Sequence, residues 1–441
     1  MKKILIIAYY FPPSGGPGVQ RVLKFVKYFP AFGWEPVVLT VSNGEFPARD
    51  ESLLKEIAPN VRVYRSQIFE PYSLYRRFTG KAAGSAVDVN AIPQKGARRS
   101  AKEKIAELIR STIFIPDARV GWLPSAVRMG KKIIKEENIS AIYSSSPPYT
   151  CALIGRALKR ATGLPWIAGF RDPWTGFENT PRRWFIPRAI DHALERSVCN
   201  EADAIDIAWL GIEKDFRAKH PGVNPAKFHH LPNGFDGEDY PAIERAKNAR
   251  FTLVYTGSLY GTRNPADLLR AVENLAAKNL IAKDAFVLKF AGRFGDEVKR
   301  MFENSAVKDC IETISYMPHS ESIRELLRAD ALLLIVDEIA GSGEVVPGKV
   351  YEYLGAGKPI LAIAPTTGAI AQLLRETGAG ATAEHGDNAA IEEIFLRYYR
   401  AFRGETTLEP ANDGEIKKYE RKETTRALAR LFNDLTQKNI R

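Results

Sequence analysis

One pattern occurs twice in the chain and constrains its fold strongly: an apolar run, a glycine-containing turn, and a segment of helical periodicity. The first copy is KILIIAYYFPPSGGPG (3–18), followed by a helical pattern at 19–29 and a second apolar run at 35–41. The second copy is FTLVYTG (251–257), followed by the helical pattern NPADLLRAVENLA (264–276). Apolar runs without a helical period are typical of buried parallel strands. The order of strand, helix and strand therefore predicts an α/β protein with two parallel sheets.

The length and the linkers predict the domain organisation. A chain of 441 residues corresponds to two or three domains of ordinary size. The polar stretch DGEDYPAIERAKNAR (236–250) separates the two copies of the pattern, and a polar amphipathic helix is expected near the end, at 415–437. We expect a first domain at 1–240, a second domain at 251–412 and a C-terminal helical segment at 413–441.

The cysteines and the apolar runs limit the class of protein. Cys151, Cys199 and Cys310 are far apart and form no CxxC pair, which argues against a disulfide framework or a zinc site and fits a reducing compartment. The start MKKILIIAYYFPP has a short apolar run without a small-residue cleavage site, so a buried strand is favoured over a signal peptide. No apolar run approaches the roughly 20 residues of a membrane-spanning helix. We expect a cytoplasmic protein.

The positive charge is concentrated near the start of the chain. Residues 1–130 hold 20 lysines and arginines against 10 acidic residues, which accounts for +10 of the net charge of +11. Such asymmetry suggests an anionic partner, either a membrane surface or a nucleic acid, although solvated lysines of a basic protein are the alternative. The least regular segment, 65–120, interleaves basic with aromatic residues. This composition resembles an interfacial membrane segment on the inner face of a membrane, and an ordinary basic loop is the alternative.

The stretch GSGEVVPGKVYEYLGAGKPILAI (341–363) has the strongest local signals for a binding site. Pro347 suits the first turn of a helix, where the free N–H groups and the helix dipole attract a phosphate or diphosphate. Gly348 lets the chain approach a ligand closely, and Lys349 adds a positive charge. Glu352 follows three residues later on the same helical face, and Glu344 lies eight residues before Glu352. A carboxylate there can accept hydrogen bonds from sugar hydroxyls, whereas an ion pair on a solvated face is the alternative.

Other candidate residues follow predicted strands, where open α/β sheets bind ligands. Arg171 and Asp172 follow such a strand, although a structural ion pair would explain them equally well. Gly15 and Gly16 lie in the first glycine turn and allow close approach of a ligand. His229 and His230 have no third metal ligand at a useful spacing, so we interpret the pair as surface histidines and expect no metal site.

The motifs together resemble those of family 4 glycosyltransferases with the GT-B fold. The stretch 341–363 resembles the E-x7-E signature with its following G-x-P-(I/V) strand, FPPSGG (11–16) resembles the F-P-P-x-x-G-G loop, and PNGFD (232–236) resembles the junction motif, with Asn233 and Gly234 in a turn. The resemblance implies two Rossmann-like domains facing across a cleft, with the last helix returning to the first domain. The first domain would bind the acceptor and the second a nucleotide-sugar.

The resemblance also implies roles for single residues. Glu352 would hold the ribose hydroxyls, Glu344 the donor sugar, and Val346 to Lys349 the diphosphate. In the family's G-R-x(4)-K motif this chain has Ser258 in the arginine position and Arg263 in the lysine position.

Two further positions depart from the pattern or supplement it. Arg293 follows another strand and is the candidate for the second cation on the diphosphate. Arg171 stands where the family commonly has a catalytic histidine, and this puts that role in doubt, while Asp172 matches the aspartate. The resemblance implies neither a metal nor another cofactor.

We therefore expect a retaining transferase that moves a sugar from a nucleotide-diphospho-sugar to a hydroxyl acceptor. A lipid-linked or saccharide acceptor, in surface polysaccharide or glycolipid synthesis, is expected from the basic and aromatic first third. Two alternatives remain open at this point. One is an NAD-dependent or other nucleotide-dependent enzyme, against which the missing G-x-G-x-x-G counts. The other is a non-catalytic protein that binds a nucleotide-sugar or, less in keeping with the motifs, a nucleic acid.

Overall fold

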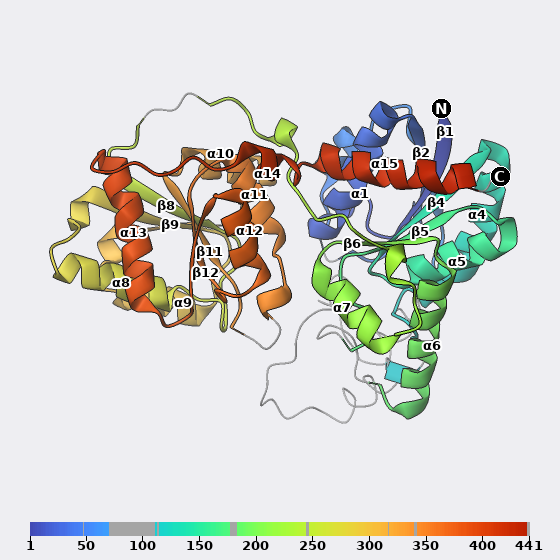
Figure 1. Ribbon diagram of the computed structural model, residues 1–441, viewed down its shortest axis with the longest axis horizontal. Coiled ribbons are helices and arrows are strands. Elements are labelled where there is room, and N and C mark those ends of the chain that lie inside the picture. Colours follow the sequence, from blue (N-terminus) through green and yellow to red (C-terminus); the bar gives the residue numbers. More distant parts are fainter. Residues whose placement is uncertain are drawn as a thin grey trace. The chain divides into compact units, whose positions relative to one another are not determined.

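The chain folds into two compact units in the computed structural model (Figure 1). The structure describes residues 1–46, 48–69, 111–112, 114–176, 183–243, 247–315, 317–338 and 342–438. The first unit comprises Met1–Pro232 and Thr424–Arg441, and the second comprises Asn233–Glu423. The boundaries between the units therefore lie after residues 232 and 423. The sequence analysis placed the domain limits at 240 and 412.

The first unit is built on a seven-stranded parallel sheet in the order β3-β2-β1-β4-β5-β6-β7. Its strands are β1 (Lys2–Ala8), β2 (Trp34–Val41), β3 (Arg62–Ser66), β4 (Ile139–Ser146), β5 (Trp166–Phe170), β6 (Ala204–Ile207) and β7 (Phe228–His230). Its described helices are α1 (Pro17–Tyr28), α4 (Leu123–Glu137), α5 (Thr150–Thr162), α6 (Phe185–Glu201), α7 (Leu210–Lys219) and α15 (Arg421–Lys438). Ile4 to Ile7 of β1 are fully buried, as the apolar run predicts.

Helices cover both faces of this sheet. The core on one face includes residues of α4, α5, α6 and α7, and the core on the other face includes residues of α1 and α15. Phe432 of α15 packs against Phe29 and Trp34, with ring centroids 6.3 and 5.5 Å away, and Figure 1 shows this helix beside α1 and β2. The end of the chain thus completes the core of the first unit.

The second unit is built on a six-stranded parallel sheet in the order β10-β9-β8-β11-β12-β13. Its strands are β8 (Phe251–Thr256), β9 (Phe286–Ala291), β10 (Ile311–Ile314), β11 (Ala331–Ile335), β12 (Ile360–Ile363) and β13 (Gly380–Ala383). Its described helices are α8 (Ala266–Ala277), α9 (Asp296–Asn304), α10 (His319–Arg328), α11 (Gly348–Ala356), α12 (Ala369–Thr377), α13 (Asn388–Arg403) and α14 (Asp413–Lys417).

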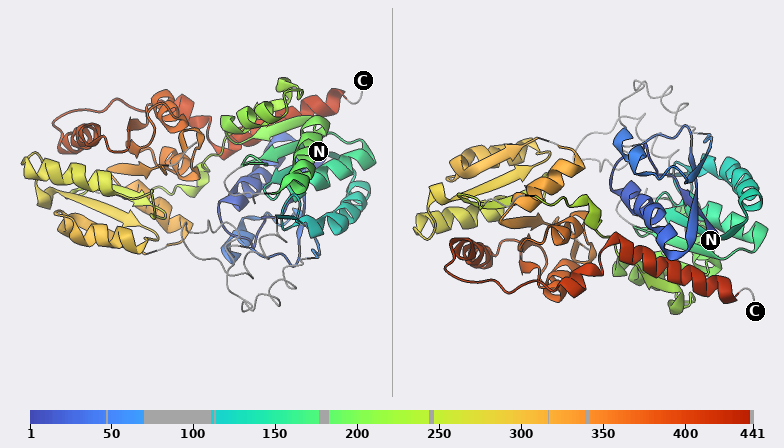
Figure 2. Two further views of the ribbon diagram at one scale, coloured as in Figure 1. Left: turned by 90° about the horizontal axis from the view of Figure 1, so that it is seen from below. Right: turned by 90° about the horizontal axis from the view of Figure 1, so that it is seen from above.

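The second sheet is also covered on both faces (Figure 2). One core combines alternate strand residues with α8, α9 and α13, and the other combines the intervening residues with α10, α11 and α12. In this sheet the strand order reverses between β8 and β11, because the chain runs from β8 outward to β10 and then returns to pair β11 with β8. The carboxyl ends of strands at such a reversal are the usual ligand site of an open α/β sheet.

One sequence prediction needs correction, and another falls largely on residues that the structure does not describe. The single helix predicted at 415–437 is two helices, because the chain between α14 and α15 pairs with Phe235 instead. The amide of Phe235 donates to Tyr419 (3.0 Å), and the amide of Arg421 donates to Phe235 (2.7 Å). The basic segment 65–120, proposed for membrane contact, lies largely outside the described residues, since 70–110 and 113 are not among them.

Candidate active site

Lys349 is the centre of the candidate site in the second unit. Its ammonium group donates to the hydroxyl of Tyr255 (2.8 Å) and to the carbonyl of Thr256 (2.9 Å), at the carboxyl end of β8. The ammonium also lies 4.2 Å from the centroid of the Tyr255 ring, a cation–π contact. These acceptors are neutral, so the positive charge of Lys349 is not cancelled by them.

The surroundings of Lys349 weaken its hold on a proton. Burial, together with the charge of Arg263, lowers the pKa of Lys349 to about 7, while Glu352 and Asp337 act in the opposite direction. Lysine ordinarily titrates near 10.4. The amine is therefore poised to gain a proton when an anion arrives, because a nearby negative charge favours the ammonium form.

Arg263 and Asp337 form an ion pair across the reversal point of the sheet. Arg263 follows β8 and Asp337 follows β11, and the guanidinium donates to the carboxylate. Each side chain is 25% exposed, so solvent reaches the pair. Arg263 was expected to grip a phosphate, whereas Asp337 is a partner that the sequence analysis missed.

The turns after β8 and β9 are pressed together beside Lys349. Gly257 has φ = +121°, and a Cβ atom there would lie 2.6 Å from Nζ of Lys349. Only glycine adopts this backbone conformation without strain while leaving room for the ammonium. A Cβ atom at Gly292 would collide with the carbonyl of Gly257. Arg293 follows directly, and its carbonyl accepts from the amide of Leu259 (2.9 Å), while its side chain is exposed.

The start of α11 carries the expected backbone donors, with one correction. Pro347 is the residue before the first helical residue (φ −62°, ψ 139°), and the helix begins at Gly348 rather than at Pro347. No side chain among the described residues caps this helix start, and Gly348 is exposed. Free amides and the positive end of the dipole therefore face outward next to Lys349, an arrangement that favours an anion.

Glu352 is near Lys349 but is bonded to a histidine. Its Oε1 lies 3.2 Å from Nε2 of His319, at the start of α10, and its backbone carbonyl accepts from the hydroxyl of Tyr240 (2.8 Å). The side chains of Glu352 and His319 are 32% and 43% exposed, so both can reach a ligand. Glu344 is exposed in a short 3-10 turn (Ser342–Glu344) before α11.

The other predicted residues lie in the first unit. Arg171 directly follows β5, and its guanidinium donates to the carbonyls of Ser146 (3.4 Å) and Pro147 and packs against Gly18 at the start of α1. Gly16 is the residue before α1, and the amide of Gly15 donates to the carbonyl of Ala48 (2.9 Å). The strand order of this sheet also reverses, between β1 and β4, so these residues gather at its ligand-binding edge.

Asp172 is held in a partly desolvated position. Burial raises the pKa of its carboxyl group, and the charge of Arg171 opposes this effect. Its charge in turn adds to the burial that raises the pKa of Tyr149. A carboxylate with a raised pKa is a better proton acceptor than an exposed one.

The junction motif joins two distant parts of the chain. The amide oxygen of Asn233 lies 3.5 Å from a guanidinium nitrogen of Arg421, and a Cβ atom at Gly234 would collide with the carbonyl of Tyr419. At the start of the motif, the buried Arg21 donates to the carbonyls of Leu231 (2.7 Å) and Pro232 (3.1 Å).

The buried partner of Arg21 escaped the sequence analysis. The carboxylate of Asp206 accepts from Arg21 (2.7 Å) and from the hydroxyl of Tyr143 (2.7 Å), and Arg21 and Asp206 are 1% and 0% exposed. Such a buried charge pair is costly to break, since the remaining charge would be unpaired.

Of the two histidines interpreted as surface residues, His230 is exposed and His229 is partly exposed. Burial lowers the pKa values of His229 and His230, which lie on β7. A different group, His192, Glu195 and His220, brings three possible metal-ligating atoms within 4.8 Å of one another. His192 and Glu195 lie on α6 and His220 directly follows α7, so no local spacing rule could have found this group.

Comparisons with known proteins agree with this arrangement. Residues 236–400 match the model of the family described as glycosyl transferases group 1. The second unit therefore contains a domain of the group 1 glycosyltransferase family. No curated protein sequence matches it significantly.

Solved structures similar to this transferase share its GT-B fold. The lipopolysaccharide outer core galactosyltransferase WaaB is 14% identical, with 98% of this chain and 99% of that chain covered and a TM-score of 0.57. S. aureus TarM, in complex with Fondaparinux, α-GlcNAc-glycerol and UDP, is 12% identical, with 98% and 100% covered and a TM-score of 0.60. The α,α-trehalose 6-phosphate synthase of Burkholderia multivorans is 11% identical, with 99% and 97% covered and a TM-score of 0.55. The predicted GT-B fold is confirmed.

The structure also bears on the membrane question. Within the described ranges, the transferase has no helix of the length and apolar character needed to span a membrane.

Proposed function

We propose that this transferase moves a sugar from a nucleotide-diphospho-sugar to a hydroxyl group with retention of anomeric configuration, without a metal. The observation that supports this most directly is Lys349, a half-buried amine with neutral partners beside the uncapped start of α11. Both features favour a dianionic or trianionic group at the same place. A diphosphate is the part of such a donor that carries this charge.

Each neighbouring group has a place in the proposed reaction. The bond between the sugar C1 atom and the diphosphate oxygen breaks, and the acceptor oxygen forms a new bond to C1. Lys349, Arg263 and the α11 amides stabilise the charge that develops on the leaving diphosphate. Arg293 would approach the same diphosphate from the turn after β9, and Glu352 would accept hydrogen bonds from the ribose.

The reacting centre is assigned to the remaining residues. Glu344 would contact the donor sugar. Asp172 would accept the proton of the acceptor hydroxyl, which its raised pKa favours. Arg171 would stabilise negative charge near the transferred sugar, in the position of the histidine that related sequences commonly have.

We also propose that the acceptor belongs to surface polysaccharide or glycolipid synthesis and that the enzyme binds an anionic membrane surface. The start of α6 supports this proposal, because Trp184, Phe185, Ile186 and Ile190 are 41%, 69%, 47% and 46% exposed. Arg188 in the same turn is also exposed. Exposed aromatic and aliphatic side chains beside a cation are typical of helices that lie in a lipid interface.

A donor screen tests the central proposal. Purified protein is incubated with UDP-, GDP- and ADP-sugars, and thermal stability and released nucleoside diphosphate are measured. One nucleotide class should raise the melting temperature and be slowly hydrolysed, and the anomer of the transferred sugar, determined by NMR, should match that of the donor. Absence of stabilisation by every donor would contradict the proposal, and an inverted anomer would contradict retention alone.

A further inference from the structure

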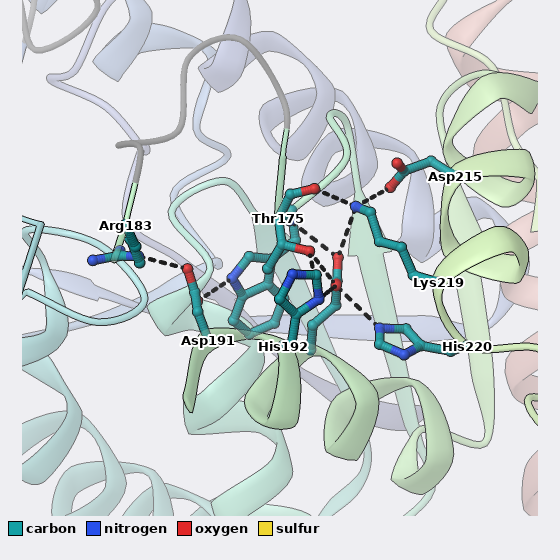
Figure 3. Close-up of polar contacts among 9 residues, drawn as sticks. Thr175, Arg183, Asp191, His192, Asp215, Lys219 and His220 are labelled. Atoms are coloured by element: carbon teal, nitrogen blue, oxygen red, sulfur yellow. Dashed lines mark hydrogen bonds and ion pairs between the residues drawn. The ribbon is translucent and has the colours of Figure 1, made fainter. Parts of the chain in front are cut away.

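The loop Arg171–Thr175 is fixed by two buried carboxylates on one face of α6. Asp191 and Glu195 lie four residues apart, hence on the same side of the helix, and are 4% and 0% exposed. Figure 3 shows Arg183 directed at Asp191, and Lys219 directed at Thr175 and Asp215. Buried carboxylates are costly unless they are hydrogen-bonded and charge-balanced, so their partners identify what they do.

Glu195 holds the end of the loop. It accepts hydrogen bonds from the amide of Thr175 (3.1 Å) and from its hydroxyl (2.6 Å). Nε2 of His220 lies 3.0 Å from the same carboxylate, and Nζ of Lys219 lies 3.6 Å from it. Lys219 also donates to the carbonyl of Thr175 and to Asp215 (2.5 Å). The amide, hydroxyl and carbonyl of Thr175 are thus all bonded by this group.

Asp191 holds Trp174, the residue before Thr175. It accepts from the indole N–H of Trp174 (2.9 Å) and from Nε of Arg183 (2.8 Å). The Trp174 ring also stacks on Tyr149, with centroids 4.9 Å apart and planes 11° apart, and the hydroxyl of Tyr149 donates to the carbonyl of Pro173.

The start of the loop is fixed from the other side. The amide of Arg171 donates to the carbonyl of Ser146 (3.0 Å), and the indole of Trp209 donates to the carbonyl of Arg171 (3.1 Å). Asp172 therefore lies between two anchored ends, and a loop anchored at both ends has little freedom to move its side chains.

We propose that Asp191 and Glu195 are positioning residues, which act by holding the loop so that Asp172 and Arg171 keep a productive orientation toward the acceptor. This inference rests on the proposed function, because it assigns the reaction to Asp172. Catalytic groups need support from neighbours that lock their geometry, and a displacement of about 1 Å can cost on the order of 100-fold in rate. Burial raises the pKa of Glu195, but the hydrogen bond from His220, the charge of Lys219 and the bonds from Thr175 outweigh it, so the group stays ionised at neutral pH.

A metal ion is the competing interpretation of the same cluster. His192, Glu195 and His220 could supply three ligands, as catalytic zinc sites often have. Glu195, however, already has a counter-charge in Lys219 and hydrogen bonds from Thr175. Nδ1 of His192 makes only long contacts, 3.4 Å to Thr175 and 3.9 Å to Glu195, and its side chain is 42% exposed. His192 is therefore the residue that separates the two interpretations, since a positioning network does not need it.

The test uses the full-length protein with Glu195→Gln, which keeps the size of the side chain and removes its charge. Thr175→Val removes the loop's hydroxyl from the same contact and serves if Glu195→Gln does not fold. Arg196→Gln, at an exposed position of the same helix, is the matched control. Hydrogen exchange of peptides covering 166–176, kcat and the donor Kd are measured for each.

We expect faster exchange in 166–176, a fall in kcat of at least tenfold and a donor Kd within twofold of wild type for Glu195→Gln and Thr175→Val. Arg196→Gln should match wild type in all three. Unchanged exchange, or faster exchange with unchanged kcat, would overturn the inference. If no donor is turned over by the wild type, the proposed function fails, while the exchange data still decide whether Glu195 holds the loop.

Zinc addition and chelation complete the test. Neither should change the melting temperature or kcat of the wild type, and His192→Ala should retain both. Stabilisation by Zn²⁺ that His192→Ala abolishes would overturn the inference, because the cluster would then be a metal site.

Discussion

The affinity of the transferase for a nucleoside diphosphate should fall steeply as the pH rises above 7, and Lys349 should be the cause. In the free protein burial lowers the pKa of Lys349 to about 7, so most of the amine is neutral at pH 8. A bound diphosphate favours the ammonium form and raises this pKa. Binding above pH 7 must therefore take up a proton.

The size of the effect follows from the pKa. If the bound form titrates well above pH 9, the dissociation constant rises about fivefold from pH 7 to 8 and roughly tenfold from pH 8 to 9, hence about 50-fold between pH 7 and 9. A phosphate monoester loses its last proton near pH 6, so titration of the ligand adds little in this window. An ordinary lysine, with a pKa near 10.4, would leave the affinity almost constant from pH 7 to 9.

Isothermal titration calorimetry with the nucleoside diphosphate from the donor screen measures this directly. Titrations at pH 7, 8 and 9, each in two buffers of different ionisation enthalpy, yield the dissociation constant and the number of protons taken up. We expect uptake near one proton at pH 8 to 9 in the wild type and near zero in Lys349→Gln. Lys299→Gln, at an exposed lysine of the same unit, is the control and should behave as wild type.

The stability of the free protein provides an independent check with a defined sign. The folded pKa of Lys349, about 7, lies below the unfolded value of 10.5, so between these values the unfolded chain binds more protons. The free energy of unfolding therefore gains about 1 kcal/mol per pH unit from this group as the pH rises through that window. Below pH 7 the penalty is fully present and constant. A pH-independent affinity in the wild type, or an equal slope in Lys349→Gln, would refute the reasoning.

Four further outcomes are expected. Arg263→Met should weaken diphosphate binding about 10- to 100-fold, measured by calorimetry at pH 7, because it removes a charged hydrogen-bond donor. Glu352→Gln should raise the donor Kd at least tenfold while the melting temperature changes little, since the side chain is partly exposed; an unchanged Kd would remove it from the ribose site. Asp172→Asn should lower kcat by 100-fold or more with the donor Kd unchanged, and an unaffected kcat would exclude it as the proton acceptor. Phe185→Ser should reduce co-sedimentation with phosphatidylglycerol vesicles roughly tenfold, whereas Leu280→Ser, at an exposed apolar residue of the second unit, should not; equal binding of both variants would contradict the α6 surface.

The fold was largely predictable because its signals are local. Apolar runs without a helical period became the parallel strands, and the glycine turns became the carboxyl edges of the two sheets. The strand-end rule selected Asp172, and the helix-start signal selected Lys349, before any contact was known. The prediction failed where a distant segment competes with a local pattern, as at 418–420, where pairing with Phe235 interrupts the predicted C-terminal helix.

The partners of the site residues were not predictable for the same reason. Asp337 lies 74 residues from Arg263, and His319 lies 33 residues from Glu352, so neither pair has a sequence spacing that could reveal it. Asp337 did carry one usable signal, since it follows a predicted strand just as Asp172 does.

The first half of α6 departs from the usual distribution of apolar and charged residues on a surface helix. Hydrophobic periodicity assigns apolar residues to the buried face of a helix and charged residues to the solvent. In α6 the reverse holds, because Asp191 and Glu195 are buried while Phe185 and Ile190 are exposed. This inversion is informative, because buried carboxylates and exposed aromatic residues both need a partner outside the helix. The carboxylates bind the loop Arg171–Thr175, and a lipid surface would suit the exposed side chains.

In both sheets, a cation at the candidate ligand-binding edge is held by backbone carbonyl groups. Lys349 donates to the carbonyl of Thr256, and Arg171 donates to the carbonyls of Ser146 and Pro147, in each case at the carboxyl end of a strand beside the reversal point. Carbonyl oxygens orient a cation without cancelling its charge, whereas a carboxylate cancels it. Arg263, which is paired with Asp337, is the contrasting case. The charge available to an incoming diphosphate in the second unit therefore comes mainly from Lys349 and the α11 amides. Although several cations surround the candidate site, the pH dependence of diphosphate binding should therefore reflect the titration of Lys349.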